Sequence, residues 1–268
     1  MTALGEAGGA GRARAGRQTA GRRFRNWFRG DGGKGLVLVS PTLGYALLLL
    51  AAPLLAVTAF SLWTQDYLDV DRTLTLENYR VAWTEPLYRT LMLRSLAISG
   101  IVTFATVILA FPVAYYVSFR VRPERKALWL FLITIPFWTS YLLRVFLWKV
   151  ILGYNGVLNS GLLGLGIIQE PLTFILYSAE AVVMTLAHAW APFAILPIFV
   201  ALEKIDRSLL EAAEDLGDGP IRRFCRVTLP LALPGVVAAA LIVFIPTVGD
   251  YVTPKLVGGH DGLMIANM

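Results

Sequence analysis

The sequence predicts an all-α, polytopic membrane protein, and three observations support this fold class. Apolar residues make up 56% of the 268 residues and charged residues only 16%. The mean hydropathy is +0.63, and several apolar runs reach about 20 residues, the length at which a helix crosses the hydrocarbon core. Period-2 alternation is absent, and a spanning segment must satisfy its own backbone polar groups, so helices are predicted rather than strands.

Five apolar segments are long enough to be membrane spans. They cover residues 36–63, 95–119, 127–148, 172–202 and 231–249. At 1.5 Å per residue, each helix crosses about 30 Å of hydrocarbon. We therefore expect a bundle of five helices within one transmembrane domain over residues 36–268.

The segment 1–35 is predicted to be a basic, disordered tail. It contains eight of the 24 Lys and Arg residues and consists mostly of Gly, Ala and Arg, so it has almost nothing to bury. The "RVRPERK" turn (120–126) and the segment 203–229 are also basic. Because Lys and Arg concentrate in cytoplasmic loops, these three segments and the N-terminus are expected in the cytoplasm. The positive charge thus flanks a lipid bilayer, and we expect no nucleic-acid partner.

The sequence gives no support for redox, metal or nucleotide chemistry. Cys225 is the single cysteine, which excludes an internal disulfide, and no Cys/His cluster has metal-ligand spacing. The stretch "RGDGGKGL" lacks the glycine and hydroxyl positions of a phosphate-binding loop. No catalytic constellation of an enzyme is found. We expect no metal, no cofactor and no catalysis in this chain.

A charged segment between the fourth and fifth apolar runs is predicted to fold as helix, glycine turn, helix. Ser208 and Glu211 have the spacing of a capping box, and Gly217 follows where a helix commonly ends in the left-handed conformation. Pro220 suits the first position of a second helix, which is expected to run to about Val227. The apolar side of the pair should pack against another surface; its residues are Leu209, Leu210, Ala213, Leu216, Ile221 and Phe224.

The same segment resembles the EAA signature of ABC importer permeases. The pattern is Glu-Ala-Ala, three residues, Gly, nine residues, Val, one residue and Leu-Pro, with Val where the signature usually has Ile. The matching residues are Glu211, Ala212, Ala213, Gly217, Val227, Leu229 and Pro230. The resemblance implies that residues 206–230 form coupling helices, which sit in a groove of a cytoplasmic ATPase subunit.

Three longer stretches are similar to the first of the two permeases of spermidine/putrescine importers. They are "PFWTSYLLRVFLWKVILGYNGVLN" (136–159), "LEKIDRSLLEAAEDLG" (202–217) and "FIPTVGDYVTPKLVGGHDGLMIAN" (244–267). The resemblance implies a permease of the bacterial inner membrane that works with a second permease, two ATPase subunits and an external substrate-binding protein. Family members continue into a sixth span beyond "LMIANM", so the chain is expected to be a shortened form.

Other readings remain open at this point. The same architecture could carry ferric iron, an opine or an amino-acid-like solute, since permeases for several solutes share the signature. A secondary carrier driven by protons or sodium is the rival from another class, but it would need no ATPase-docking loop. The external binding protein makes the first selection of the solute in such systems.

Three ionisable residues lie inside the predicted spans, where a charge costs about 2.5–3.5 kcal/mol near the centre. Arg144 is expected to snorkel to the outer interface. Glu180, about eight residues inside the fourth span, either lines a wet pathway or pairs with Arg144. His188 is expected to hydrogen-bond to a neighbouring helix.

A polyamine pathway should offer carboxylates and aromatic faces to ammonium groups. The candidates are Glu180, Asp250, Tyr251 and Trp138. Prolines are expected to interrupt the spans and free backbone carbonyls. These prolines are Pro112, Pro136, Pro192, Pro197 and Pro246.

Overall fold

The computed structural model describes residues 31–66 and 69–268, which divide into two compact units, Met1–Ala82 and Trp83–Met268. Most of the predicted tail, residues 1–30, lies outside the described residues. Residues 31–35 begin the first described helix, α2 (Asp31–Ser61). Each unit is described by itself below.

The first unit contains α2, a two-stranded antiparallel ribbon and most of α3 (Glu77–Thr84). The strands are β1 (Thr64–Asp66) and β2 (Asp69–Asp71), and the sequence patterns did not predict them. Asn78 joins α3 to the end of α2, because its side-chain amide donates to the carbonyl oxygens of Ser61 (3.1 Å) and Trp63 (2.7 Å).

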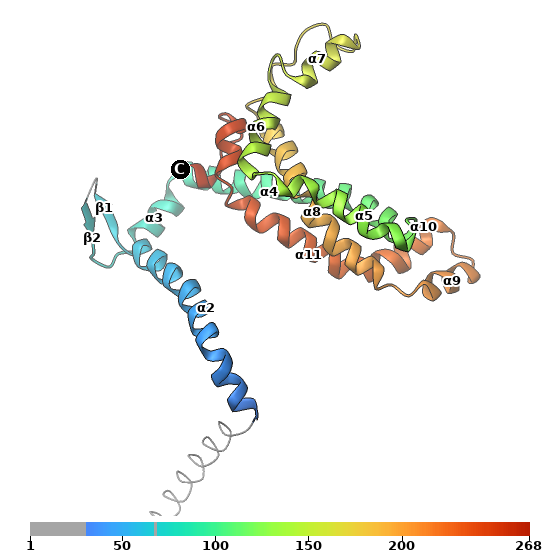
Figure 1. Cartoon of the computed structure of the whole chain (residues 1–268). Coiled ribbons are helices and arrows are strands. Elements are labelled where there is room, and N and C mark those ends of the chain that lie inside the picture. Colours follow the sequence, from blue (N-terminus) through green and yellow to red (C-terminus); the bar gives the residue numbers. More distant parts are fainter. Residues whose placement is uncertain (1–30, 67–68) are drawn as a thin grey trace, which may run out of the picture. The chain divides into compact units, whose positions relative to one another are not determined.

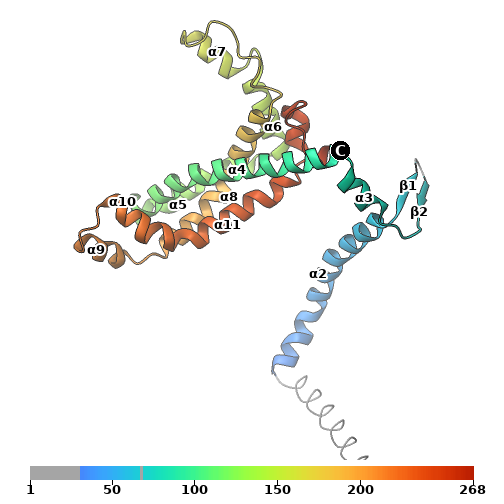
Figure 2. The ribbon, with the colours of Figure 1, turned by 180° about the vertical axis from the view of Figure 1, so that it is seen from behind.

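Three long helices form the core of the second unit: α4 (Pro86–Phe119), α8 (Ala179–Glu203) and α11 (Leu229–Val248). Figures 1 and 2 show them side by side along most of their length. Many buried positions between them hold small side chains, among them Ser95, Ser99, Ala114, Ala189, Ala194, Ala232 and Ala239. Small residues let helix backbones approach closely, which is the usual packing mode between membrane helices.

Five described segments are long and apolar enough to cross a membrane. They are Leu38–Ser61, Pro86–Phe119, Tyr141–Gly164, Ala179–Glu203 and Pro220–Val248. The number of spans agrees with the prediction. The boundaries of the third and fourth spans differ from those predicted.

The continuous third span predicted over 127–148 is wrong. The chain instead forms α5 (Pro123–Thr134), the 3₁₀ turn η1 (Ile135–Trp138) and α6 (Tyr141–Leu152). Pro136 cannot donate a backbone hydrogen bond, and the two residues after η1 are not helical, since Thr139 is extended and Ser140 has ψ 137°, which ends the helix. A further helix, α7 (Val157–Gly164), follows α6 and points away from the bundle (Figure 1).

The fourth span begins at Ala179, seven residues later than the predicted start at 172. The Ser178 hydroxyl caps α8 by accepting the Ala181 N–H at 3.1 Å. Upstream, the buried Asn159 side chain exchanges hydrogen bonds with the backbone of Leu172, which holds that stretch as an irregular loop.

Only one of the five prolines expected to interrupt the spans lies at a helix break, and it is Pro136. Helices α4, α8 and α11 continue through the other four, Pro112, Pro192, Pro197 and Pro246. Packing against neighbouring helices maintains a helix at such positions.

The last residues fold back onto the start of α4. They contain a short π-type turn, η3 (Pro254–Gly258), and a 3₁₀ turn, η4 (Ile265–Asn267). The Ile265 N–H donates to the Ser95 hydroxyl at 2.7 Å, and the Arg94 guanidinium donates to the His260 carbonyl at 2.8 Å.

Candidate functional site

The loop over residues 206–230 (the 206–230 loop) begins with α9 (Arg207–Asp215). The capping box predicted at Ser208 is wrong, because Asp206 is the N-cap. Its backbone is extended, and its carboxylate accepts the Ser208 N–H at 3.0 Å. This hydrogen bond lowers the pKa of Asp206 below its ordinary value. The carboxylate therefore stays charged at the helix start, where a negative charge is stabilising.

The left-handed turn predicted at Gly217 is confirmed. Its φ is +86°, and two reversed hydrogen bonds close the end of α9. The Asp218 N–H donates to the Ala213 carbonyl at 3.0 Å and the Gly217 N–H to the Glu214 carbonyl at 2.9 Å. This is the Schellman arrangement, in which a residue without a Cβ is strongly favoured at the left-handed position.

The second helix of the loop starts at Pro220 as predicted, but it does not end near Val227. Helix α10 (Pro220–Arg223) passes through the π-type turn η2 (Phe224–Thr228) into α11 without interruption. The Leu229 N–H donates to the Phe224 carbonyl, five residues earlier. The widened turn directly precedes Pro230, which has no N–H to donate within this continuous helix.

Many charges of the loop pair with each other. Arg223 forms an ion pair with Glu214, and Arg226 forms one with Asp218 at 3.1 Å. Part of the loop's charge is therefore used within the loop itself. The acidic first helix and the basic second helix also hold each other.

The apolar side of the loop is only partly covered by the chain itself. Phe224 packs edge-on against Phe111 and Tyr115 of α4, with ring centroids 5.5 and 6.2 Å apart. Leu216 and Ile221, on either side of the glycine turn, remain 87% and 80% exposed. The turn thus presents two large apolar side chains at its tip.

The signature residues occupy different environments. Ala213 is buried, whereas Glu211, Ala212 and Pro230 are exposed and Val227 and Leu229 are half-buried. Glu211 lines a cavity of about 280 Å³ between the loop and the end of α4. The other lining residues are Tyr115, Phe119, Arg120, Arg207, Leu210 and Arg223.

A second cavity, of about 340 Å³, lies among α6, α8 and the end of α11. It is lined by Phe137, Tyr141, Arg144, Ala189, Trp190, Phe193, Pro246, Gly249 and Asp250. The Tyr141 hydroxyl donates to Asp250 Oδ2 at 2.6 Å and also contacts the Thr253 hydroxyl at 2.6 Å. One carboxylate and several aromatic faces therefore meet in this cavity.

Arg144 is buried in the wall of this cavity, with 8% of its surface exposed. Its Nη1 donates to the Ala189 carbonyl at 3.2 Å, and its guanidinium lies 5.8 Å from the centre of the Tyr141 ring. Among the residues that the structure describes, Arg144 Nε and Trp190 Nε1 have no hydrogen-bond partner. The snorkelling expected for Arg144 is wrong, because α8 supplies its partner inside the bundle.

The pair of Arg144 and Glu180, one of the two alternatives left open for Glu180, does not form. Glu180 is exposed in the first turn of α8, at the very start of the span rather than about eight residues inside it. Arg144 contacts the Ala189 carbonyl instead. Ala189 lies nine residues after Glu180 on α8, which corresponds to about 13 Å along the helix axis. The physical reason is that α6 packs Arg144 at the level of Ala189, too far along α8 from Glu180 for an ion pair.

Of the other residues predicted to line the pathway, only one lies in the cavity. Asp250 lines the cavity, whereas Trp138 and Tyr251 are exposed and outside its lining. His188 accepts a hydrogen bond from Trp148 Nε1 at 3.1 Å, which confirms its expected bond to a neighbouring helix.

Sequence reasoning missed the aromatic wall, which comprises Tyr141, Trp190 and Phe193. One signal was available, since Tyr141 and Arg144 are three residues apart and so share a helix face. Trp190 and Phe193 could not be predicted, because their place in the wall depends on how α8 packs against α6.

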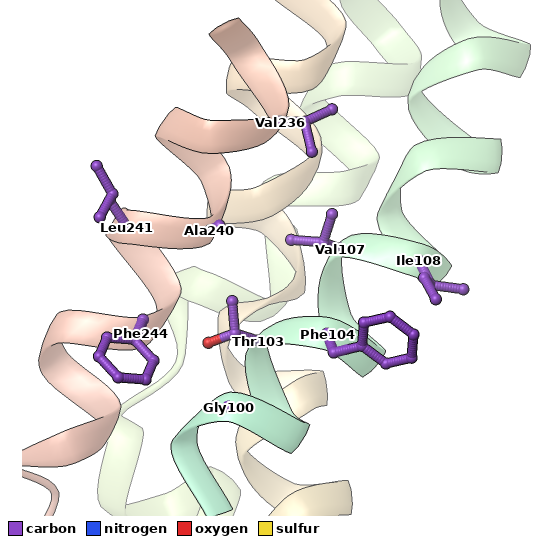
Figure 3. Close-up of a pocket in the computed structure, with 9 residues that line it drawn as sticks. All are labelled: Gly100, Thr103, Phe104, Val107, Ile108, Val236, Ala240, Leu241 and Phe244. Atoms are coloured by element: carbon purple, nitrogen blue, oxygen red, sulfur yellow. The ribbon is translucent and has the colours of Figure 1, made fainter. Parts of the chain in front are cut away.

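An apolar groove of about 500 Å³ separates α4 from α11 (Figure 3). Its lining residues are Gly100, Thr103, Phe104, Val107, Ile108, Val236, Ala240, Leu241 and Phe244. The one hydroxyl, on Thr103, already donates to the Ser99 carbonyl at 2.7 Å. The groove therefore offers nothing to stabilise a charged solute.

A family model described as "Binding-protein-dependent transport system inner membrane component" matches residues 74–267. The spermidine/putrescine transport system permease protein PotB of Haemophilus influenzae is 37% identical over 233 residues, covering 87% of this chain and 80% of that protein. The protein of the same name from Escherichia coli K12 is 35% identical over 232 residues, covering 86% and 83%.

A solved bacterial ABC transporter, involved in the import of the acidic polysaccharide alginate, is similar in fold. The TM-score is 0.63 at 15% identity, with 89% of this chain and 84% of that chain covered. At this identity the likeness concerns the fold alone.

Proposed function

This chain belongs to the family of binding-protein-dependent transport system inner membrane components, and on that premise we propose that it carries polyamines as the permease subunit of an ATP-driven importer. The observation that carries the proposal is the 37% identity to a spermidine/putrescine permease over 233 residues. The cavity at Asp250 supports it, because a carboxylate beside aromatic rings suits an ammonium group.

The 206–230 loop is the proposed docking site for a cytoplasmic ATPase. Exposed Leu216 and Ile221 at the glycine turn suit a soluble partner with an apolar groove, and Glu211 is exposed beside them. In this proposal two ATPase subunits hydrolyse ATP, a second permease completes the pathway, and an external binding protein delivers the solute. The N-terminus lies in the cytoplasm, as the basic segments favour.

In the proposed pathway, Asp250 stabilises the ammonium groups in the cavity. Trp138 and Tyr251 are exposed aromatic residues. Each directly follows a cavity residue in the sequence, Phe137 and Asp250 respectively. Glu180, in the first turn of α8, is proposed to attract cations where the pathway opens.

The test is uptake into proteoliposomes that contain this chain with the second permease, ATPase and binding protein of the neighbouring genes. Radiolabelled putrescine and spermidine should accumulate only with ATP on the ATPase side and should be insensitive to proton and sodium ionophores. Uptake that ionophores abolish, and that needs no ATPase, would identify a secondary carrier instead.

A second candidate, an amino-acid-like solute, is favoured by one observation. The Arg144 guanidinium and the Trp190 indole line the cavity, and Arg144 forms no ion pair with a carboxylate among the described residues. A fully protonated polyamine has no acceptor for them, whereas a carboxylate has two oxygens. Putrescine and 4-aminobutyrate, which have similar lengths, separate the two candidates. Uptake of 4-aminobutyrate that is lost in Arg144→Gln would favour the second.

A further inference from the structure

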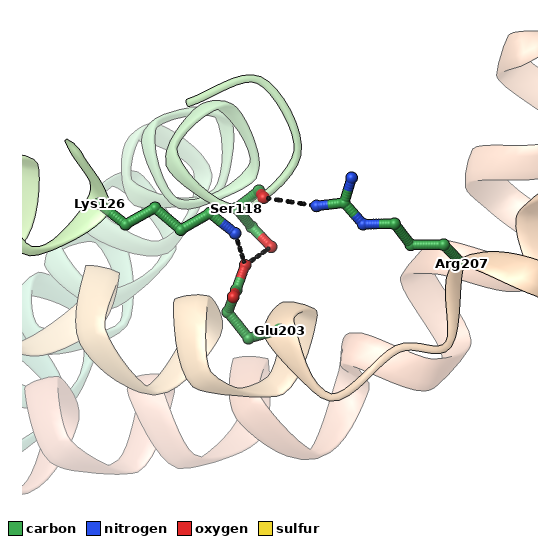
Figure 4. Close-up of polar contacts among 4 residues, drawn as sticks. All are labelled: Ser118, Lys126, Glu203 and Arg207. Atoms are coloured by element: carbon green, nitrogen blue, oxygen red, sulfur yellow. Dashed lines mark hydrogen bonds and ion pairs between the residues drawn. The ribbon is translucent and has the colours of Figure 1, made fainter. Parts of the chain in front are cut away.

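Four side chains from four helices meet at the end of the bundle next to the 206–230 loop (Figure 4). Lys126 Nζ of α5 donates to Glu203 Oε1 at 2.6 Å, and the Ser118 hydroxyl of α4 donates to the same oxygen at 2.7 Å. Arg207, the first residue of α9, donates through Nη2 to the Ser118 carbonyl at 3.4 Å.

The ion pair is partly shielded from solvent. The Lys126 side chain is 13% exposed and the Glu203 side chain 35%. A partly buried ion pair is screened by salt less than an exposed one. The hydrogen bond from the Ser118 hydroxyl to Glu203 Oε1 stabilises this pair further. The Lys126–Glu203 pair is therefore expected to contribute more stability than the loop's pairs, Arg223–Glu214 and Arg226–Asp218.

Helix α5 contacts the rest of the bundle mainly through its second half, where Leu130 and Ile133 are half-buried against the core and Trp129 packs edge-on against Tyr116 of α4. None of its residues is buried in the part of the chain that the structure describes. The three core helices, in contrast, each bury several apolar side chains. In the first turn of α5, where no side chain packs against the core in the described residues, the bond from Lys126 to Glu203 ties the helix to α8.

Glu203 lies next to the 206–230 loop, whereas Lys126 lies on the helix that leads to the cavity wall. Glu203 is the last residue of α8 and stands three positions before Asp206, the N-cap of α9. Helix α5 runs for 12 residues, about 18 Å, and continues into η1, from which Phe137 contributes to the cavity wall.

The break at η1 makes α5 a separate body. Pro136 and the two non-helical residues after η1 interrupt the hydrogen-bond ladder between α5 and α6. A short helix bounded by such a break can shift without carrying the following helix with it.

We propose that the Lys126–Glu203 pair links the 206–230 loop to the cavity. When the loop moves, Glu203 pulls Lys126, α5 follows, and η1 shifts the cavity wall at Phe137. Lys126 and Glu203 are positioning residues in this scheme, since neither lines the cavity. The inference rests on the proposed function, because it assumes that an ATPase moves the loop.

The experiment measures ATP hydrolysis and putrescine uptake in the same proteoliposomes of the complete transporter. Lys126→Gln and Glu203→Gln should each lower the number of solute molecules carried per ATP by about tenfold, a typical size for coupling between sites, while ATP hydrolysis continues. The exchange Lys126→Glu with Glu203→Lys restores the opposite charges and should recover most of the ratio.

Matched controls come from the same two segments. Glu124 in α5 and Lys204, adjacent to Glu203, are exposed and have no side-chain partner among the described residues. Glu124→Gln and Lys204→Gln remove one charge each at nearly the same place and should leave the ratio unchanged.

The outcomes separate this inference from the proposed function. If the wild-type complex neither hydrolyses ATP nor takes up solute, the proposed function fails. If it does both, and Lys126→Gln and Glu203→Gln keep the wild-type ratio, the link is wrong. Single variants that do not assemble leave the charge exchange to decide, and an exchange that assembles but stays uncoupled overturns the proposal.

Discussion

Gly235 in α11 lies directly against the backbone of Pro197 in α8. A Cβ atom on Gly235 would come within 2.6 Å of the Pro197 carbonyl oxygen and would overlap the Cβ of Ala201. Backbone atoms cannot move aside as a flexible side chain does. This glycine therefore sets the separation of α8 and α11, which pack closely together.

Gly235→Ala should destabilise the protein by about 1–3 kcal/mol, the usual effect of overpacking. The measurement is the unfolding temperature in detergent, followed by tryptophan fluorescence. Gly100→Ala in α4 is the control, because nothing lies within 4 Å of its Cβ position, and it should be neutral or slightly stabilising. Equal unfolding temperatures for both variants would contradict the close approach.

Gly217 and Gly219 form a natural pair for testing the turn of the 206–230 loop. A Cβ at either position meets nothing within 4 Å, but φ is +86° at Gly217 and −66° at Gly219. Gly217→Ser should be strained by about 1–2 kcal/mol, whereas Gly219→Ser should be tolerated as an N-cap.

The measurement is the amount of ATPase that co-purifies with each variant. Gly217→Asn should recover part of the loss, since asparagine tolerates the left-handed region. Comparable ATPase recovery from Gly217→Ser and Gly219→Ser would show that the left-handed turn does not matter for docking.

Asn159 holds the irregular segment before α8. Its side-chain amide donates to the carbonyls of Gly153 and Leu172, both at 3.2 Å, and its oxygen accepts the Leu172 N–H at 2.9 Å. Asn159→Ala leaves these groups without partners, at a cost of about 1–3 kcal/mol.

Local opening should then speed chymotrypsin cleavage at the exposed aromatic residues Tyr154, Phe174 and Tyr177. Asn155→Ala is the control, because Asn155 is exposed and its side chain has no partner among the described residues. The role given to Asn159 is refuted if cleavage is equally slow in both variants.

Asp250→Asn tests the carboxylate of the cavity. Asp250 accepts the Tyr141 hydroxyl on Oδ2 and the Val252 N–H on Oδ1, and the amide keeps only one of these acceptors and loses the charge. KM for putrescine uptake should therefore rise by about tenfold or more, as expected for one charged hydrogen bond. Asp261→Asn is the control, since Asp261 is exposed and contacts only His260 through its side chain among the described residues. An unchanged KM in Asp250→Asn would remove Asp250 from the pathway.

The 206–230 loop illustrates how far local sequence reaches. The start at Pro220 and the left-handed Gly217 were predictable because each follows from the conformational limits of a single residue. The N-cap was missed because Asp206 and Ser208 both suit that position, and only the backbone angles choose between them. The π-type turn at Phe224 leaves no comparable mark in the sequence.

The sequence by itself determined the five apolar spans and the class of the protein, because hydropathy and length act segment by segment. The tertiary structure decided which groups meet. It broke the third span at Pro136 while leaving Pro112 inside a continuous helix. It also gave Arg144 the Ala189 carbonyl instead of Glu180, and Lys126 the carboxylate of Glu203. Such pairings depend on how helices distant in the sequence pack together, and a burial or charge pattern along one helix does not specify them.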